Sequence, residues 1–309
     1  MGHSYTDLDA IGAAVGLASA VQSFDIPVFI ATDRKKTLAA TLLEKLDSEN
    51  MGDIIIGQEH ALELLNKKTL LIVVDTHIES FVEFPKLYEK AETRVIIDHH
   101  RRAVTDIENA LIFHHDPGAS STCEMVTELL QYINPEINIS ETVAEALLAG
   151  IMLDTKDFVI GTGVRTFEAA AFLKDKNADT VKVKRLFANT LEMNKLRTTV
   201  ISSAESFMKC AIATADFESK DIRVISAQAA DELLAKVLQC MEFPGAGGAE
   251  IFPSRVGIYS PSGWTESTRL AMAVTARLGK DGPSLYVGLN EFSPVMKLSG
   301  RCKNYDLSD

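Results

Sequence analysis

The chain has 309 residues, a length that allows two domains of ordinary size, and 46% of them are hydrophobic, enough for a buried core. Its formal net charge of −12 argues against a protein that coats long nucleic acid, because such proteins need a basic face. The sequence contains no apolar run of the roughly 20 residues that a membrane-spanning helix needs. Its four cysteines are too widely spaced for a metal knuckle, so we expect a reducing, cytoplasmic setting.

Short apolar segments alternate with helix-like segments in the first part of the chain. The spacing of apolar residues predicts helices at 10–23, 37–49, 58–65 and 84–90, and buried strands at 28–31, 53–56, 70–74 and 94–97. This alternation predicts an α/β fold in which a parallel sheet carries helices on both faces. Ligands in such folds gather beyond the carboxyl ends of the strands, where Asp75 and Asp98 stand in this chain.

The same pattern continues further along the chain. It predicts an edge strand at 111–115 and helices at about 122–132, 141–153 and 165–175, the first of them capped by Ser120, Ser121 or Thr122. We predict a first domain at residues 1–178, a helical linker at 179–204 and a smaller α/β domain at 205–309. The second domain opens with an expected antiparallel pair at 207–213 and 222–225, followed by a helix at 227–238. Periodicity is lost over 239–309, where only 267–278 has a helix-like pattern.

Four short segments concentrate imidazole and carboxylate groups. The first lies at residues 2–10, just ahead of a predicted helix, and each of the other three ends an apolar run. Hard divalent ions prefer oxygen ligands, and added imidazoles shift the preference toward manganese, iron or zinc. A carboxylate that bridges two such ions lets them clamp a phosphoryl group and activate water for in-line attack. We interpret the segments as one two-metal hydrolytic site built from His3, Asp7, Asp9, Asp75, Asp98, His99, His100 and Asp154.

These motifs resemble the DHH phosphoesterase superfamily, which is named after the triplet seen here as Asp98-His99-His100. The GHSYTDLDA start, the DHHRR triplet segment, the ASSTCE segment at 119–124 and the LAGIMLDTK segment at 148–156 look most like its GdpP-type branch of bacterial cyclic-di-AMP phosphodiesterases. The resemblance covers about residues 1–238 and is specific across 1–175. It implies a parallel-sheet DHH domain followed by a smaller DHHA1-like substrate domain.

The resemblance also implies a role for each site residue. His3 and Asp7 would hold one Mn²⁺, while Asp9, His99 and Asp154 would hold a second, with Asp75 bridging both. His100 would polarise the phosphate or assist the leaving oxygen, and Asp98 would orient His99 or bond to the backbone. The expected reaction opens cyclic di-AMP to linear pApA, with a cyclic dinucleotide or a short oligonucleotide as substrate. Contacts to the substrate are expected from Arg101, Ser120, Ser121 and Arg165.

Several of these residues also have an ordinary structural explanation. Ser120 and Ser121 are helix caps before they are phosphate contacts, and Arg101 and Arg165 could equally pair with neighbouring carboxylates. His77 is expected to be a surface histidine and His60 a solvated helix residue. The same motifs also fit an oligoribonuclease or a 3′-phosphoadenosine-5′-phosphate phosphatase of this superfamily, or a catalytically impaired remnant that binds metal.

The sequence departs from the GdpP pattern at both ends. A ligand at position 3 normally follows a supporting strand, so we expect that the chain is a fragment of a longer protein. The resemblance to GdpP-type proteins implies that the upstream part anchors it in a membrane. The resemblance leaves open whether the chain forms a homodimer. DHHA1 domains normally end in a Gly-Gly-Gly-His segment, yet no histidine follows His115. We therefore expect residues from about 239 onward to be a frame-shifted reading, which translation of the other frames would test.

Overall fold

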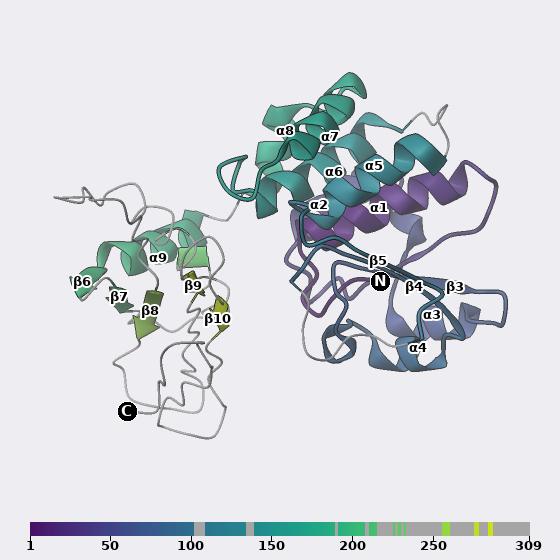
Figure 1. The fold of residues 1–309 in the computed structure, drawn as a ribbon, viewed down its shortest axis with the longest axis horizontal. Helices are drawn as coiled ribbons and strands as arrows, with labels where there is room; N and C mark the ends of the chain where they lie inside the picture. The colour runs from purple at the N-terminus through teal and green to yellow at the C-terminus, as the bar shows by residue number, and fades with distance from the viewer. Residues whose placement is uncertain are drawn as a thin grey trace. The chain divides into compact units, whose positions relative to one another are not determined.

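The computed structural model describes residues 1–101, 109–133, 139–188, 191–207 and 210–214, a few helical residues between 225 and 232, and strands at 255–259, 275–277 and 284–286. The chain divides into two units, Met1–Ala188 and Asn189–Asp309 (Figure 1). The linker predicted at 179–204 is shared between them, because helix α8 (Thr180–Leu186) belongs to the first unit and α9 (Leu191–Ser202) to the second. All predicted metal ligands lie in the first unit.

The strands of the first unit pair in parallel, as predicted. Strand β1 (Ile30–Ala31) pairs with β2 (Ile55–Ile56). A second group has the order β3 (Leu70–Val74), β4 (Thr93–Asp98) and β5 (Ile112–His115), which places β5 at an edge. Their register brings the carboxyl ends of β3 and β4 together and sets Asp98 opposite His115.

Helices cover both faces of this sheet, which confirms the predicted fold class. Figure 1 shows α1, α5 and α6 on one face and the short helices α3 and α4 on the other. Side chains alternate accordingly along the strands: Val73 and Ile96 enter the core beside α3 and α4, whereas Val74 and Ile97 enter the core beside α1, α5 and α6. The helices of this unit, besides α8, are α1 (Leu8–Gln22), α2 (Ala40–Ser48), α3 (Gln58–Leu64), α4 (Pro85–Lys90), α5 (Thr122–Ile133), α6 (Glu141–Asp154) and α7 (Val164–Asp175), with short 3₁₀ turns at Gly52–Ile54 and Glu79–Phe81.

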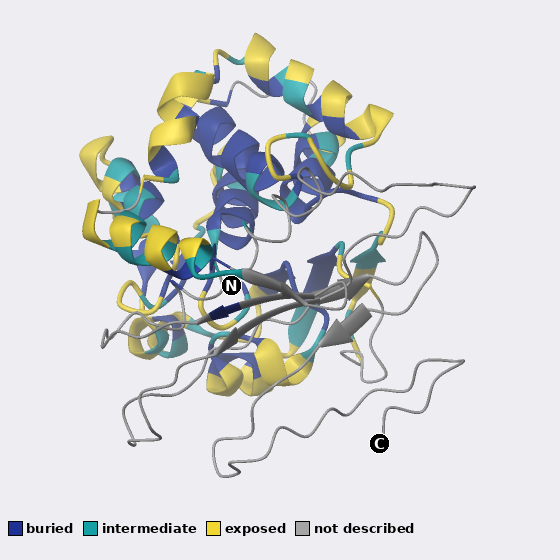
Figure 2. Cartoon of the chain, turned by 90° about the vertical axis from the view of Figure 1, so that its left-hand side faces the viewer, coloured by how far each residue is buried: buried dark blue, intermediate teal, exposed yellow. Residues whose placement is uncertain are grey.

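Helices α1 and α6 form the centre of the larger core and are buried over most of their length (Figure 2). Such all-round burial is typical of helices that are apolar on every side. Glycines allow the two helices to approach closely, because a Cβ at Gly12 would lie 2.5 Å from the carbonyl oxygen of Ala146. At Gly150 a Cβ would lie 2.8 Å from the Cα of Asp9. The close crossing therefore places the start of α1 against the second half of α6.

The second unit contains α9 and short strands. Strand β6 (Glu205–Phe207) is antiparallel to β7 (Cys210–Thr214), which is parallel to β8 (Arg255–Tyr259), and β9 (Thr275–Arg277) is antiparallel to β10 (Ser284–Tyr286). The helix expected at 267–278 is wrong at 275–277, where cross-strand hydrogen bonding forms β9. Residues 222–224 and most of 227–238 and 239–309 lie outside the described residues, so the pairing, the helix and the frame shift predicted there stay predictions.

Candidate metal centre

His3 is held in place because the backbone on both sides of it bonds to the sheet and to the segment around Val82. The Met1 ammonium donates to the Ile72 carbonyl (3.1 Å), and the Met1 carbonyl accepts from the Val74 amide (3.0 Å), so Met1 runs beside β3. His3 forms a β-bridge with Val82. Residues 1–3 therefore pair with the sheet at the place where the sequence led us to expect a supporting strand, and the prediction that the chain is a fragment of a longer protein stays a prediction.

Asp7 and Asp9 are positioned by the start of α1. Asp7 is the N-cap, and its Oδ1 accepts from the amides of Asp9 (3.0 Å) and Ala10 (3.1 Å). Asp9 is fully buried, and its two oxygens accept from the amides of Thr122 and Cys123, both at 2.8 Å. The N-terminus of α5 thus binds the Asp9 carboxylate through two backbone amides, as helix N-termini bind anions.

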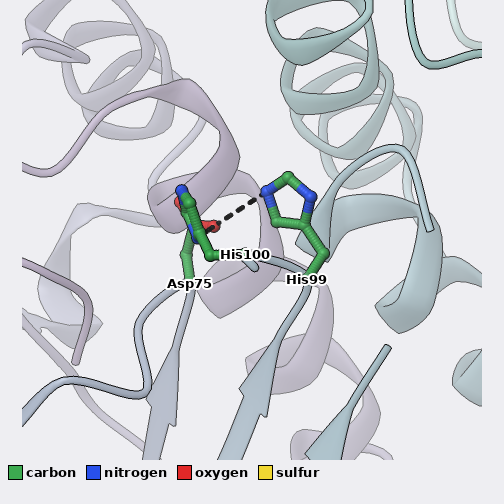
Figure 3. A group of neighbouring side chains, drawn as sticks. All are labelled: Asp75, His99 and His100. Carbon is green, nitrogen blue, oxygen red and sulfur yellow. Dashed lines mark ion pairs between the residues drawn. The ribbon is translucent and has the colours of Figure 1, made fainter. Parts of the chain in front are cut away.

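Asp75 lies between two groups of side chains. It follows β3 directly with a φ of 62°, a left-handed conformation that is uncommon outside glycine and clusters at functional sites. Its Oδ2 is 3.4 Å from Nε2 of His3, while its Oδ1 is 3.5 Å from Nε2 of His99 (Figure 3). Thr122 Oγ1 also donates to Oδ1 at 3.0 Å. Each oxygen of this buried carboxylate therefore faces a different set of potential ligands.

His99 completes the second of these sets. Its Nε2 lies 2.9 Å from Oδ2 of Asp154 and 3.8 Å from Oδ2 of Asp9. The same nitrogen is buried and has no directed hydrogen bond among the described residues. A buried imidazole nitrogen that faces several carboxylate oxygens fits the role of a metal ligand. The donors thus form two groups that fit divalent cations: His3, Asp7 and Asp75; and Asp9, His99 and Asp154.

The charges in this cluster shift its pKa values strongly. Burial alone would lower the pKa of His3, but Asp7 and Asp75 raise it to about 11. Burial also opposes the charged form of His99, yet Asp154 and Asp9 raise its pKa to about 10. Burial together with repulsion from Asp75 raises the pKa of Asp9 well above its usual value, and raises that of Asp154. The site therefore gathers more negative charge than its own imidazoles balance, which favours cation binding.

A second network lies behind these ligands. Asp98 is fully buried, accepts a hydrogen bond from His77 Nδ1 on Oδ2, and accepts one from His100 Nδ1 on Oδ1 (2.8 Å). Oδ1 of Asp98 also accepts from the backbone amide of His100 (3.3 Å), which is one of the two roles expected for it, whereas the side chains that it contacts are those of His100 and His77 and not that of His99. Burial of Asp98 is outweighed by these imidazoles, so its pKa lies below the usual range. The expectation of a surface His77 is wrong: its side chain is 1% exposed because it packs between Asp98 and the ring of His115, 4.8 Å away. His60 is exposed on α3, as predicted.

His100 and His99 approach the Asp75 carboxylate from β4. Nδ1 of His100 lies 3.6 Å from Oδ1 of Asp75, and Figure 3 shows both imidazoles next to this carboxylate. The His100 side chain is half exposed, in contrast to that of His99. Burial would lower the pKa of His100, but Asp98 and Asp75 raise it. His100 is therefore the most exposed imidazole of this site and the one that a substrate can reach most readily.

The predicted substrate contacts have protein partners in the structure. Ser120 Oγ donates to Glu124 Oε2 (2.5 Å), and Ser121 Oγ accepts from the Glu124 amide (3.0 Å), so both serines stabilise the first turn of α5. Arg165 forms a fork with Glu128 and also donates to Asp116, each at 2.6 Å. Arg101 is exposed directly after His100, and the neighbouring Arg102 lies outside the described residues. Their contacts with a substrate stay predictions.

Sequence patterns did not identify three features that shape the centre. Thr122 bonds to Asp75 through its hydroxyl and to Asp9 through its amide, although the pattern assigned it only to a helix cap. Gly150 leaves space beside Asp9, and His77 supports Asp98. The position of Thr122 at a helix start was the only available signal, because its partners lie far away in the sequence.

Comparisons with known proteins identify relatives of this chain. Residues 1–151 match the DHH family, N-terminal domain. The chain is 43% identical over 238 residues to the cyclic-di-AMP phosphodiesterase GdpP of Geobacillus thermodenitrificans, covering 76% of this chain and 36% of that protein. It is 39% identical over 241 residues to GdpP of Bacillus subtilis, covering 76% and 37%. The chain thus spans about a third of the length of these relatives.

A solved structure supports the fold. The exopolyphosphatase-related protein from Bacteroides fragilis superposes with a TM-score of 0.61 at 19% identity, covering 76% of this chain and 69% of that one.

Among the described residues, no helix combines the length and the apolar composition that crossing a membrane requires. The family match over residues 1–151 and the identity with these relatives lead to one conclusion: this part of the chain is a DHH-family N-terminal domain.

Proposed function

We propose that this protein hydrolyses cyclic di-AMP to linear pApA in a manganese-dependent reaction. The observation that carries the proposal is the position of Asp75, whose two oxygens face two separate groups of nitrogen and oxygen donors. One carboxylate shared by two ligand groups is the arrangement expected for a two-metal phosphoesterase. The choice of a cyclic dinucleotide rests on the similarity to two proteins named cyclic-di-AMP phosphodiesterase.

The donors fit two divalent cations of intermediate softness. His3, Asp7 and Asp75 would hold one, and Asp9, His99 and Asp154 would hold the other together with Asp75. Manganese accepts this mixture of imidazole and carboxylate more readily than calcium or magnesium does. Two such cations, when bound, neutralise the charge of a phosphodiester and activate a water molecule for in-line attack.

His100 is the residue that serves the leaving group in this proposal. Its bond to Asp98 favours the doubly protonated imidazolium, because the adjacent carboxylates raise its pKa. As the phosphorus–oxygen bond to the 3′ oxygen breaks, Nε2 gives its proton to that oxygen, and water supplies the new oxygen on phosphorus. Arg101 and Arg165 would pair with substrate phosphates, with Ser120 and Ser121 as hydroxyl contacts at the start of α5.

The test is turnover of cyclic di-AMP by the chain with Mn²⁺, with the product identified by mass spectrometry. Parallel assays on pApA and on adenosine 3′,5′-bisphosphate separate this activity from an oligoribonuclease or a bisphosphate phosphatase. The expected result is pApA from cyclic di-AMP at the highest kcat/KM of the three. Preferential turnover of either linear substrate would refute the proposed substrate. Bound metal without turnover of any of them would identify an impaired metal-binding protein.

A further inference from the structure

A buried histidine outside the predicted ligand set contacts the catalytic triplet. Asp98 accepts from His100 on Oδ1 and from His77 on Oδ2, so the three side chains form a line from the core to the site. His77 and Asp98 are 1% and 0% exposed, whereas His100 is 52% exposed. The line therefore connects a fixed group in the interior to the imidazole that a substrate can reach.

The hydrogen-bond roles along this line follow from chemistry. An ionised carboxylate can only accept, so His77 and His100 must each carry a proton on Nδ1. Once both Asp98 oxygens are bonded, its carboxylate plane is fixed, and the His100 ring is fixed with it. His115 adds a second restraint, because its Nε2 donates to the backbone carbonyl of His100 at 2.6 Å. The Nε2 atom of His100 remains available to the substrate.

We infer that His77 is a positioning residue, which acts through Asp98 to hold the His100 imidazole with Nδ1 protonated and Nε2 directed to the leaving oxygen. The role rests on the proposed function. Without His77, Oδ2 of Asp98 would lose its partner in a place where the described residues exclude water, and a buried carboxylate with an unmet oxygen reorients toward another donor. His100 would then lose its orientation while the metal ligands stay in place.

The inference predicts a dependence on the leaving group. Cyclic di-AMP releases a ribose hydroxyl, a poor leaving group that needs a proton from His100. Bis(4-nitrophenyl) phosphate releases nitrophenolate, which leaves without a proton. His77→Leu should therefore lower kcat on cyclic di-AMP by about 10–100-fold, the usual effect of losing such a supporting bond. The loss on the nitrophenyl ester should be much smaller, with KM for cyclic di-AMP little changed.

The experiment compares the Mn²⁺-loaded chain with three variants. His77→Leu removes the donor, and His77→Asn keeps an N–H close to the position of Nδ1, so the Asn variant should recover most of the lost kcat. His60→Leu, at an exposed position of α3, is the matched control and should behave as wild type on both substrates. Metal content by elemental analysis should stay at the wild-type value in every variant.

A second readout does not depend on turnover. In Mg²⁺-loaded protein labelled with ¹⁵N-histidine, which avoids the line broadening that paramagnetic Mn²⁺ causes, the Nδ1 proton of His100 should be protected from exchange in the wild type and in His77→Asn, and should exchange rapidly in His77→Leu. Equal losses on both substrates, failure of Asn to recover kcat, or a protected His100 proton in His77→Leu would each overturn the inference. If the wild type does not cleave cyclic di-AMP but this proton still depends on His77, the substrate proposal fails while the positioning of His100 stands.

Discussion

Substituting Gly150 by alanine tests the packing that holds Asp9 in the metal centre. A Cβ at this position would lie 2.3 Å from Cys123 Sγ, 2.7 Å from Asp9 Oδ1 and 2.8 Å from the Asp9 Cα. Cys123 is fully buried, and the Cα belongs to the backbone of α1, so a flexible side chain cannot simply move away. Helices α1, α5 and α6 must separate, or the Asp9 carboxylate must leave the amides of α5.

The expected magnitude follows from two opposing effects. Overpacking a tight core costs typically about 1–3 kcal/mol, and three contacts this short place Gly150→Ala near the upper end. Alanine in a helix recovers about 1 kcal/mol relative to glycine. We expect the free energy of unfolding to fall by about 1–2 kcal/mol, measured by urea denaturation of the metal-free chain. Because Asp9 is displaced, Mn²⁺ affinity at its site should also fall by about tenfold or more.

Gly57 provides a matched control, because a Cβ there would have no neighbour within 4 Å. Gly57→Ala, at the N-cap of α3, should lower the free energy of unfolding by about 0.5–1 kcal/mol through the weaker cap alone and leave Mn²⁺ affinity unchanged. If Gly150→Ala is as stable as Gly57→Ala and binds Mn²⁺ equally well, the close approach of α1, α5 and α6 does not position Asp9.

Two further predictions concern the metal ions themselves. Asp75→Ala should reduce bound metal from two ions per chain to fewer than one, measured by elemental analysis, because one carboxylate serves both ligand groups. The control Asp53→Ala, at an exposed position, should retain two ions. Two bound ions in Asp75→Ala would exclude the bridge. Metal binding at pH 8 should release protons, since the pKa values of His3 and His99 are raised to about 11 and about 10, and calorimetry in two buffers of different ionisation enthalpy should detect this release. Affinity should therefore rise with pH. The metal-free fold should lose stability between the ordinary histidine pKa of 6.5 and about 11, because over this range the unfolded chain has released the histidine protons that the folded chain still holds. A calorimetric heat that is independent of the buffer would contradict this account.

The sequence predicted the parts of the centre that depend on local patterns. Asp75, Asp98 and His99 end apolar strands, and parallel strands bring their carboxyl ends to one edge, so pattern and topology together predict that these residues meet. The hydrogen bonds from the start of α5 to Asp9 could not be predicted in this way, because Thr122 and Asp9 are separated by 113 residues. The burial of His77 was missed for a related reason, since its partner Asp98 was expected to orient His99 or to bond to the backbone, and not to accept a hydrogen bond from His77.

Gathering buried carboxylates in one place is unfavourable without a cation, so the fold must hold them by other means. It does so with fixed donors: the amides of Thr122 and Cys123 hold Asp9, and the Thr122 hydroxyl holds Asp75. Each donor occupies one acceptor site of a carboxylate that has about four, which leaves room for a cation on the same oxygens. The ligands are thereby set in position before metal arrives, and less rearrangement is needed on binding. This explains why the determinants of the centre lie as much in the start of α5 as in the motif that names the family.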